Sequence, residues 1–445
     1  MYQQEFLGLQ LGDERLNKRC LKIVDRVSQK PGLSFPRAVQ RWGELKALYR
    51  FFSNNKVNRD KIMEPHNKRT VERCLQEKVV LSIQDTTYLD YSHHPRKEGL
   101  GYTRDRLGGH GMLLHTVFAV SGESGLPLGI LGQDVIVRQT KHPAMETYLQ
   151  RLERNRESGK WIQGLRHSQA VATAETRVIQ VCDREADIYV FIKEIKCLCQ
   201  GFVIRCCRNR STEDGYLYEN IASGPVMGHT DIRIQRNGTR KARVAHVAIN
   251  VCSVGVLPPK VMGHKGAVLP VNIVRVEELN PPENGKSLSW ILLTSESIAT
   301  EEDCLRIVEY YRARWLIEDF HKGLKTGCKV EERQVSTRQQ LENVIGIYAV
   351  IAYQMLLLRF LSSRNNLLLA DIPLTECQQT ILRSKYPKEY AESPEQWLRL
   401  IARMGGFIGR KSDGHPGWLT LMRGMHDLIL IEQGLLLANK LVGKG

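Results

Sequence analysis

The sequence predicts an α/β protein in which a mixed β-sheet carries a β-rich insertion and lies between helical N-terminal and C-terminal regions. Three observations support this fold class. Short β-branched runs alternate with helical segments between residues 76 and 208. Residues 209–289 alternate between polar and apolar side chains, as half-buried strands do. Helical periodicity dominates before residue 75 and after residue 337.

The composition is that of an ordinary globular protein with an unusual charge. The chain has 445 residues, enough for two to four domains, with 42% hydrophobic and 25% charged residues. Because 64 Lys and Arg face 48 Asp and Glu, the net charge is +16, which favours nucleic acid or an anionic membrane surface as partner. Solvated lysines without such a partner are the plain alternative.

Cysteine usage and hydropathy predict a reducing compartment and no membrane partner. The eleven cysteines form no Cys-x-x-Cys pair, so we expect neither a disulfide framework nor a zinc ribbon. We therefore expect a cytoplasmic protein, and its positive charge favours association with the nucleoid. Residues 1–25 are charged and polar, unlike a signal peptide. The longest apolar run, residues 344–358, is too short to span a bilayer comfortably and contains Gln354. A buried helix is expected there.

Residues 1–75 are predicted to form a helical DNA-binding domain. The stretch LGDERLNKRCLKIVDRVS has helical periodicity, a second helix is expected at about 36–52, and SNNKVNRDKI gives a turn and a capped start for a third. The region holds 16 Lys and Arg against 8 Asp and Glu, which is half of the total net charge. The first helix concentrates the basic residues that are candidate DNA contacts: Arg15, Lys18, Arg19, Lys22 and Arg26.

Residues 76–208 are predicted to form the first part of the sheet. Three antiparallel strands, a helix and a β-α-β unit follow one another, which is the order of the ribonuclease H-like fold. The expected strands are 79–85, 112–120, 127–139, 177–183 and 201–207, and a charged helix is expected at about 141–157.

The remaining chain is predicted to insert, complete and extend this core. Residues 209–296 form the β-rich insertion, which the strand WILLTS closes. A long helix at 301–327 completes the core within residues 297–335, and residues 336–445 form a helical C-terminal region.

Two aspartates stand where buried strands end. Asp85 and Asp183 each close an apolar strand, so they converge if these strands are neighbours in the sheet. Glu318, in the middle of the long helix, is the candidate third carboxylate. Three hard oxygen ligands suit Mg²⁺, and two such ions can activate an attacking oxygen and stabilise a leaving one. Taken singly, each acid is equally well explained as a turn, cap or solvated residue.

The long helix carries an unusual polar stripe. Tyr311, Arg314, Glu318 and Lys325 stand at i, i+3, i+7 and i+14, within roughly a 60° arc of a regular helix. Glu318 would hold metal on this face, the two cations would bind phosphate oxygens, and Tyr311 would supply a hydroxyl or a ring.

With these residues in place, the sequence resembles the DDE transposases of the insertion sequence 4 family, especially those of the transposon-five type. The likeness rests on DTTYLDY (85–91), CDREADIY (182–189) and the Tyr-x₂-Arg-x₃-Glu-x₆-Lys motif of residues 311–325. It also covers LGDERLNKR (11–19), SLSWILLTSE (287–296) and IARMGGFIGRK (401–411), and so runs over nearly the whole chain. Relatives carry a longer segment before the LGD motif.

The resemblance implies a cut-and-paste transposase with Asp85, Asp183 and Glu318 as catalytic and metal-binding triad. Two Mg²⁺ ions are implied, with Mn²⁺ as a substitute. Tyr311, Arg314 and Lys325 would contact the end phosphates and a flipped base. The implied partners are double-stranded DNA, as terminal inverted repeats and as target, and a second copy of the chain, with the C-terminal helices as contact.

Two further residues are weaker candidates for DNA contact. Trp290 matches the tryptophan that the family carries at the start of the last insertion strand, and an aromatic face can hold an unstacked base. A core tryptophan explains it equally well. Arg205, at the end of the fifth core strand, is a candidate phosphate contact. Two other functions remain open: an idle transposase-derived DNA-binding regulator, and a ribonuclease H-like nuclease that cuts without joining.

Overall fold

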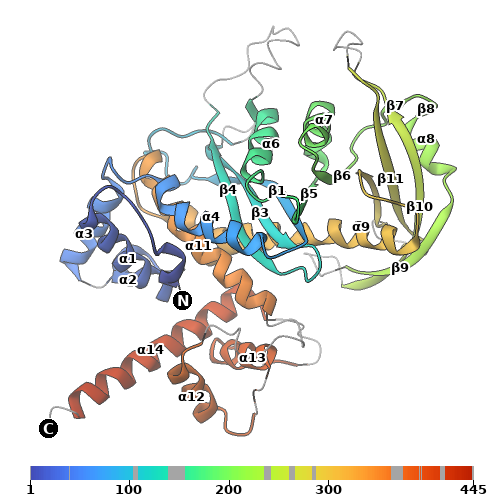
Figure 1. Cartoon of the computed structure of the whole chain (residues 1–445). Coiled ribbons are helices and arrows are strands. Elements are labelled where there is room, and N and C mark those ends of the chain that lie inside the picture. Colours follow the sequence, from blue (N-terminus) through green and yellow to red (C-terminus); the bar gives the residue numbers. More distant parts are fainter. Residues whose placement is uncertain are drawn as a thin grey trace.

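A computed structural model shows how these segments are arranged (Figure 1). The structure describes residues 2–39, 41–103, 109–138, 156–234, 242–259, 266–282, 287–361, 374–389, 391, 393–410 and 416–442. The helix predicted at 141–157 falls almost wholly outside these residues.

The core sheet has the predicted strand order. Strand β1 (Val79–Asp90) pairs antiparallel with β3 (His110–Ser121), which pairs antiparallel with β4 (Pro127–Ile136). On its other side β1 pairs parallel with β5 (Arg177–Cys182), and β5 pairs parallel with β6 (Gly201–Arg205). This is the mixed sheet of the ribonuclease H-like fold, and a two-residue strand, β2 (Gly101–Tyr102), extends its edge beside β3.

The β-rich insertion continues the core sheet instead of forming a separate one. Strand β12 (Ser289–Thr294) pairs antiparallel with β6 and so joins the two parts. All described strands belong to one twelve-stranded sheet. The insertion contributes β7 (Ser211–Thr212), β8 (Gly215–Tyr216), helix α8 (Leu217–Ala222), β9 (Val226–Ile234), β10 (Arg243–Val256) and β11 (Leu269–Glu278).

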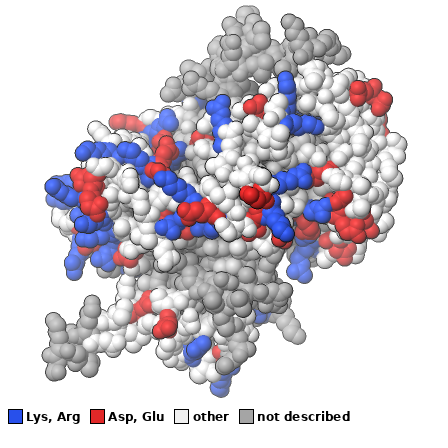
Figure 2. Space-filling view, viewed as in Figure 1, with Lys and Arg blue, Asp and Glu red and all other residues white. Residues whose placement is uncertain are grey.

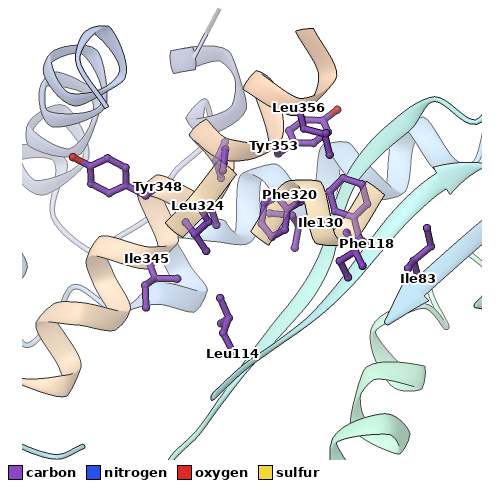
Figure 3. Packing of buried hydrophobic residues seen from close by; sticks show 14 of the residues in the cluster. Ile83, Leu114, Phe118, Ile130, Phe320, Leu324, Ile345, Tyr348, Tyr353 and Leu356 are labelled. Atoms are coloured by element: carbon purple, nitrogen blue, oxygen red, sulfur yellow. The ribbon is translucent and has the colours of Figure 1, made fainter. Parts of the chain in front are cut away.

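Two hydrophobic layers cover the core sheet. Helices α6 (Arg156–His167) and α7 (Tyr189–Cys197) pack on one face, where Trp161 and Phe191 are fully buried. The larger layer lies on the other face, between the sheet and a set of long helices. Figure 3 labels ten of its side chains: Ile83, Leu114, Phe118, Ile130, Phe320, Leu324, Ile345, Tyr348, Tyr353 and Leu356.

The segment predicted as one long helix is interrupted. Helix α9 (Glu301–Ala313) ends at Arg314, α10 (Trp315–Lys322) follows, and Gly323–Gly327 form a π-helical turn, η4. At Arg314 the backbone closes i to i+3 hydrogen bonds, from Arg314 N to Tyr311 O and from Ile317 N to Arg314 O. The prediction of a regular helix from 301 to 327 is therefore wrong, because the tightened turn and the wide π-turn both shift its phase.

The N-terminal region is helical and is joined firmly to the core. It comprises η1 (Tyr2–Phe6), α1 (Glu14–Gln29), α2 (Phe35–Val39), α3 (Trp42–Phe52) and α4 (Arg59–Cys74). The single helix predicted at 36–52 is thus two helices. The third helix begins after Asn58, whose side chain accepts a hydrogen bond from Lys61 N, as its capped start predicted.

Helix α11 (Arg338–Leu361) crosses the middle of the molecule (Figure 1). By length and composition it is the one described helix able to cross a membrane, but 78% of its apolar window is buried inside the protein. It is therefore the buried helix predicted around 344–358. The C-terminal region follows with α12 (Glu376–Lys385), α13 (Pro394–Met404) and α14 (Trp418–Val442), whose end projects away from the body.

Candidate active site

Strand pairing brings the two predicted aspartates together. Gln84 of β1 is in register with Cys182 of the parallel strand β5, so Asp85 and Asp183, one residue further on, emerge on the same face at the same edge. Each carboxylate accepts a backbone hydrogen bond, Asp85 Oδ1 from Thr86 N (2.7 Å) and Asp183 Oδ1 from Glu185 N (2.9 Å). Asp183 thereby caps the 3₁₀ turn η2 (Arg184–Ala186), which holds its side chain in place.

The electrostatics of this edge indicate a site for positive charge. Burial raises the pKa of Asp85 to about 7; the charges of Asp183 and Glu318 add to this rise, whereas Arg314 opposes it. Burial also raises the pKa of Asp183. Carboxylates crowded in this way bind a divalent cation readily, because the cation removes their mutual repulsion.

Glu318 faces the aspartates, but a guanidinium stands between them. The Arg314 Nη2 donates a hydrogen bond to Glu318 Oε1, and its Nη1 lies 3.6 Å from Asp85 Oδ2. Among the described residues, no three His, Cys, Asp or Glu side chains are close enough together to hold one metal ion. The structure thus brings Asp85 and Asp183 together and leaves Glu318 across the Arg314 side chain. The donor set itself, three carboxylates, fits Mg²⁺.

Tyr311 lies beside this ion pair and inside the protein. Burial raises the pKa of its phenol, although hydrogen bonds with the guanidinium groups of Arg205 and Arg314 oppose the rise. The Trp290 ring meets Tyr311 edge to face, with ring centroids 5.1 Å apart, and the tryptophan is only 7% exposed. Arg205 also donates to Ser289 O (3.0 Å). Trp290 and Arg205 therefore lie next to Tyr311, and the burial of Trp290 agrees with a packing role.

Lys325 contacts the same strand as Arg314, nearer the end of β1. It sits on the π-turn η4, donates to Tyr88 O (2.8 Å) and pairs with Glu331 Oε1 at 3.2 Å. The same carboxylate oxygen accepts from Asp90 N (2.8 Å). Because Tyr88 lies three residues beyond Asp85, Lys325 meets the strand about 10 Å from the aspartate. The seven residues from Glu318 to Lys325 span about 10 Å of helical rise, so this separation agrees with both side chains facing β1, and the single 60° face of the motif stays a prediction.

Sequence reasoning missed Lys160. This residue of α6 has a side chain only 4% exposed, and its Nζ donates to Glu185 Oε2 at 3.2 Å. Its charge acts to lower the pKa of Asp183. No pattern in the sequence separates this lysine from solvated ones, because the contact depends on how α6 packs over the sheet.

Sequence reasoning also missed a chain of buried polar groups under the aspartates. Thr86 Oγ1 lies 2.9 Å from His115 Nδ1, and His115 Nε2 lies 3.1 Å from Gln84 Oε1. Gln84 Nε2 donates to Gln180 Oε1 (2.8 Å), whose amide donates in turn to Ser168 Oγ and Gln200 Oε1. The donors from Thr86 to Gln180 all find acceptors if His115 is neutral, and burial lowers the pKa of His115 well below its usual value. Polar residues inside apolar strands were the available signal.

The predicted basic residues of α1 face outward in part. Arg15, Lys18 and Lys22 are exposed, whereas Arg19 and Arg26 are half-buried. Two of them have acidic neighbours: Lys18 lies 3.8 Å from Glu14, and Arg26 lies 3.4 Å from Glu44. Figure 2 shows Lys and Arg gathered over the N-terminal helices, at the left of the view, with acidic residues among them.

An exposed aromatic residue on α3 escaped the sequence reasoning. Trp42 is 69% exposed, and Lys46 Nζ lies 5.0 Å from the centre of its ring. A surface that combines an aromatic ring with cations suits nucleic acid. The signal available in the sequence was the position of Trp42 directly after RAVQR (37–41), a stretch with two arginines.

Three family models match the chain. The model described as transposase DDE domain matches residues 81–355, which include both aspartates and Glu318. The model described as transposase DNA-binding matches residues 1–57, from η1 to α3. The model described as transposase Tn5 dimerisation domain matches residues 374–443, from α12 to α14.

Proposed function

Because the chain belongs to the DDE transposase family, of the Tn5 type, we propose that it moves a DNA segment by a cut-and-paste mechanism. The family match makes the chain an enzyme that cuts and rejoins phosphodiester bonds, binds DNA, forms dimers and depends on a divalent metal. The proposal adds the order of steps, the ions and the residues. The observation that supports it most is the convergence of Asp85 and Asp183 at the ends of neighbouring parallel strands.

The proposed reaction consists of four phosphoryl transfers. Water first attacks a phosphodiester at the transposon end and releases a 3′-hydroxyl. This hydroxyl then attacks the opposite strand, which releases the flanking DNA and leaves a hairpin. A second water molecule opens the hairpin, and the 3′-hydroxyl finally attacks the target DNA. Each step forms one P–O bond and breaks another, so no energy-rich cofactor is needed.

We assign the residues as follows. Asp85, Asp183 and Glu318 hold two Mg²⁺ ions, for which Mn²⁺ can substitute. When bound, these ions activate the attacking oxygen and stabilise the leaving one. Arg314 and Lys325 bind phosphate oxygens and so orient the scissile strand. Lys325 meets the DNA nearer the end of β1 than Arg314 does, since the two cations lie apart along that strand.

Tyr311, Trp290 and Arg205 are assigned to the hairpin step. A hairpin requires a base outside the stack, and an aromatic face stabilises such a base by about 1–3 kcal/mol. Because Trp290 is only 7% exposed and packs against Tyr311, its ring must leave this contact to receive a base. Arg205 then remains beside Tyr311 as a phosphate contact.

DNA cleavage tests the proposal. The full chain is incubated with Mg²⁺ and DNA that carries the inverted repeats flanking its gene, and the products are separated on denaturing gels. We expect nicked, hairpin and strand-transfer products, and we expect Asp183→Asn to reduce all of them by roughly 10³-fold or more while DNA binding persists. The matched control is Asp214→Asn, the same change on an exposed turn of the insertion.

The alternative functions predict different gels. A nuclease without joining activity would give nicks and breaks but no strand-transfer product. An idle DNA-binding regulator would bind the ends and leave them intact at every Mg²⁺ concentration. Equal cleavage by the wild type and by Asp183→Asn would remove the assignment of the acidic residues.

A further inference from the structure

The Arg314 side chain occupies the centre of the acidic cluster. Its guanidinium bonds to Glu318 and lies 3.6 Å from Asp85 Oδ2, and the side chain is only 12% exposed. Tyr311 lies on its other side, in hydrogen-bonding contact, with 5.8 Å between the guanidinium carbon and the ring centre. The same cation thus contacts the two carboxylates that come from different elements, β1 and α10.

This position sets the arginine against a divalent ion. A Glu318 oxygen that accepts a guanidinium N–H is directed away from a shared ion at Asp85 and Asp183. A positive charge within a few ångströms also repels such an ion, and the repulsion is strong because the side chain is shielded from water. For Glu318 to coordinate a metal ion, the Arg314 guanidinium must therefore exchange Glu318 for another partner.

A phosphate is the best alternative partner for that guanidinium. Arginine binds phosphate through two parallel N–H bonds, as it binds carboxylate, so little is lost in the exchange. Of the two carboxylates that Arg314 contacts, Glu318 is the more exposed, with 36% of its side chain accessible, against 19% for Asp85. The pair is thus open to solvent on the glutamate side, where a DNA phosphate can approach.

We propose that Arg314 competes with the metal ion for Glu318. When a DNA phosphate replaces Glu318 as the partner of the Arg314 guanidinium, Glu318 becomes free to coordinate the metal ion. Metal binding and DNA binding thereby strengthen one another, by the same factor in each direction. The inference rests on the proposed function, because it takes Glu318 as a metal ligand. It restricts the active metal centre to the DNA-bound enzyme.

Mn²⁺ binding to the full chain without DNA tests the competition. Free Mn²⁺ is measured by electron paramagnetic resonance during a titration. We expect Arg314→Gln to bind Mn²⁺ roughly tenfold more tightly than the wild type, since the competing charge is gone. The matched control is Arg312→Gln, which removes a cation paired with Glu309 on the exposed side of α9 and should leave Mn²⁺ affinity unchanged.

Two further variants keep the test decisive. Glu318→Gln should remove the gain when it is combined with Arg314→Gln, which locates the ion at the acidic cluster. If Arg314→Gln does not fold, as judged by circular dichroism, Arg314→Lys serves instead and should show a smaller gain in the same direction. Unchanged or weaker Mn²⁺ binding by the folded arginine variants overturns the proposal.

The second arm tests coupling to DNA. The probe is a 5′-phosphorylated duplex of arbitrary sequence at low salt, and the Mn²⁺ that the duplex alone holds is subtracted. The duplex should tighten Mn²⁺ binding to the wild type and leave Arg314→Gln unaffected; equal tightening in both would overturn the coupling. This arm measures Mn²⁺ binding and not cleavage, so its outcome is independent of the cleavage assay above. A chain that cleaves DNA in that assay but shows no coupling in this one refutes the inference and leaves the proposed function standing.

Discussion

At the scale of single residues, the buried cluster around Glu5 shows how the N-terminus is fixed. Glu5 Oε2 lies 2.5 Å from His66 Nδ1, and Glu5 Oε1 accepts from Arg73 Nη1 at 2.9 Å. Ile130 N donates to His66 Nε2 (3.1 Å), so the imidazole proton is on Nδ1 and points at the carboxylate. Burial lowers the pKa of His66, which keeps the ring neutral at pH 7.

This cluster predicts a pH dependence of stability. Burial acts to raise the pKa of Glu5, but the hydrogen bond from His66 and the charge of Arg73 outweigh it and lower the pKa to about 2 from 4.5. A carboxylate with a depressed pKa in the folded state adds stability above about pH 4.5 and loses it as the pH falls toward 2. We expect Glu5→Gln to lower the free energy of unfolding by roughly 2–4 kcal/mol at pH 7, because Arg73 is left without its counter-charge.

Urea denaturation at pH 7, 5 and 3 measures this effect. The difference between wild type and Glu5→Gln should shrink as the pH falls below about 4.5, since the unfolded wild type then binds a proton at Glu5 that the folded state does not take up until about pH 2. Glu14→Gln is the control, an exposed acid on α1 whose replacement should change little at any pH. A difference that stays constant from pH 7 to pH 3 would contradict the account.

Single residues also show what the sequence could predict of the site. Asp85 and Asp183 were predictable because strand ends are visible as breaks in apolar runs, and the convergence needs only that the strands be neighbours. The pairing of Arg314 with Glu318 was not, since side-chain partners are chosen by local packing. The contact of Lys160 beside Asp183 depends on the position of a separate helix and leaves no trace in spacing.

At the scale of elements, the segment from α9 to η4 shows the limit of periodicity. A helical pattern was predicted correctly, but side-chain spacing does not report how many residues each turn holds. The tightened turn at Arg314 and the π-turn at Gly323–Gly327 could therefore not be predicted, whereas the contact of Lys325 with β1 beside Tyr88 agrees with the helical rise between Glu318 and Lys325. The insertion shows the same limit, because alternation predicted its strands but could not show that β12 would pair with β6.

The polar chain between β1, β5 and α6 gives a prediction at this scale. Replacing Gln180 by leucine leaves Gln84, Ser168 and Gln200 without their buried partner, and we expect a loss of about 2–4 kcal/mol in the free energy of unfolding. The matched control is Gln163→Leu, which changes an exposed residue of α6 and should cost less than about 0.5 kcal/mol. Urea denaturation at pH 7 compares the two, and equal stabilities would show that the chain contributes nothing.

At the scale of the whole molecule, one arginine holds the N-terminal region against the core. Arg333, which is 3% exposed, donates to the carbonyl oxygens of Pro31, Leu33 and Cys328. Its guanidinium also lies over the Tyr348 ring of α11, at 4.5 Å. The segment between α1 and α2 is therefore tied directly to the chain that follows the Glu318 helix, which fixes the DNA-binding region relative to the acidic cluster.

The C-terminal helix gives a prediction for the assembly. Helix α14 exposes Leu435, Leu436 and Leu437, each between 44% and 60%, within the segment that matches the Tn5 dimerisation domain. Because exposed leucines in a row are costly unless a partner covers them, we expect the double change Leu436→Asp and Leu437→Asp to abolish dimers. Sedimentation velocity with and without DNA measures the effect.

The control for this prediction is Leu75→Asp, at the end of α4, where the leucine is 42% exposed outside the dimerisation segment. It should leave the mass of the assembly unchanged. A dimer that survives the double change in α14 would place the contact between copies elsewhere.

Helix α11 has a consequence for the synthesis of the protein. It packs against η1, α3 and α4 at the start of the chain, against β4 in the middle and against α13 near the end. The first helices are therefore synthesised almost 300 residues before α11, with which they pack. At ordinary translation rates this delay is about 15 to 60 s. Nascent chains that stop before residue 338 expose the side of α4 that faces α11, including Ile62, which packs against Gly346 in the complete fold. Such chains are expected substrates of chaperones and proteases.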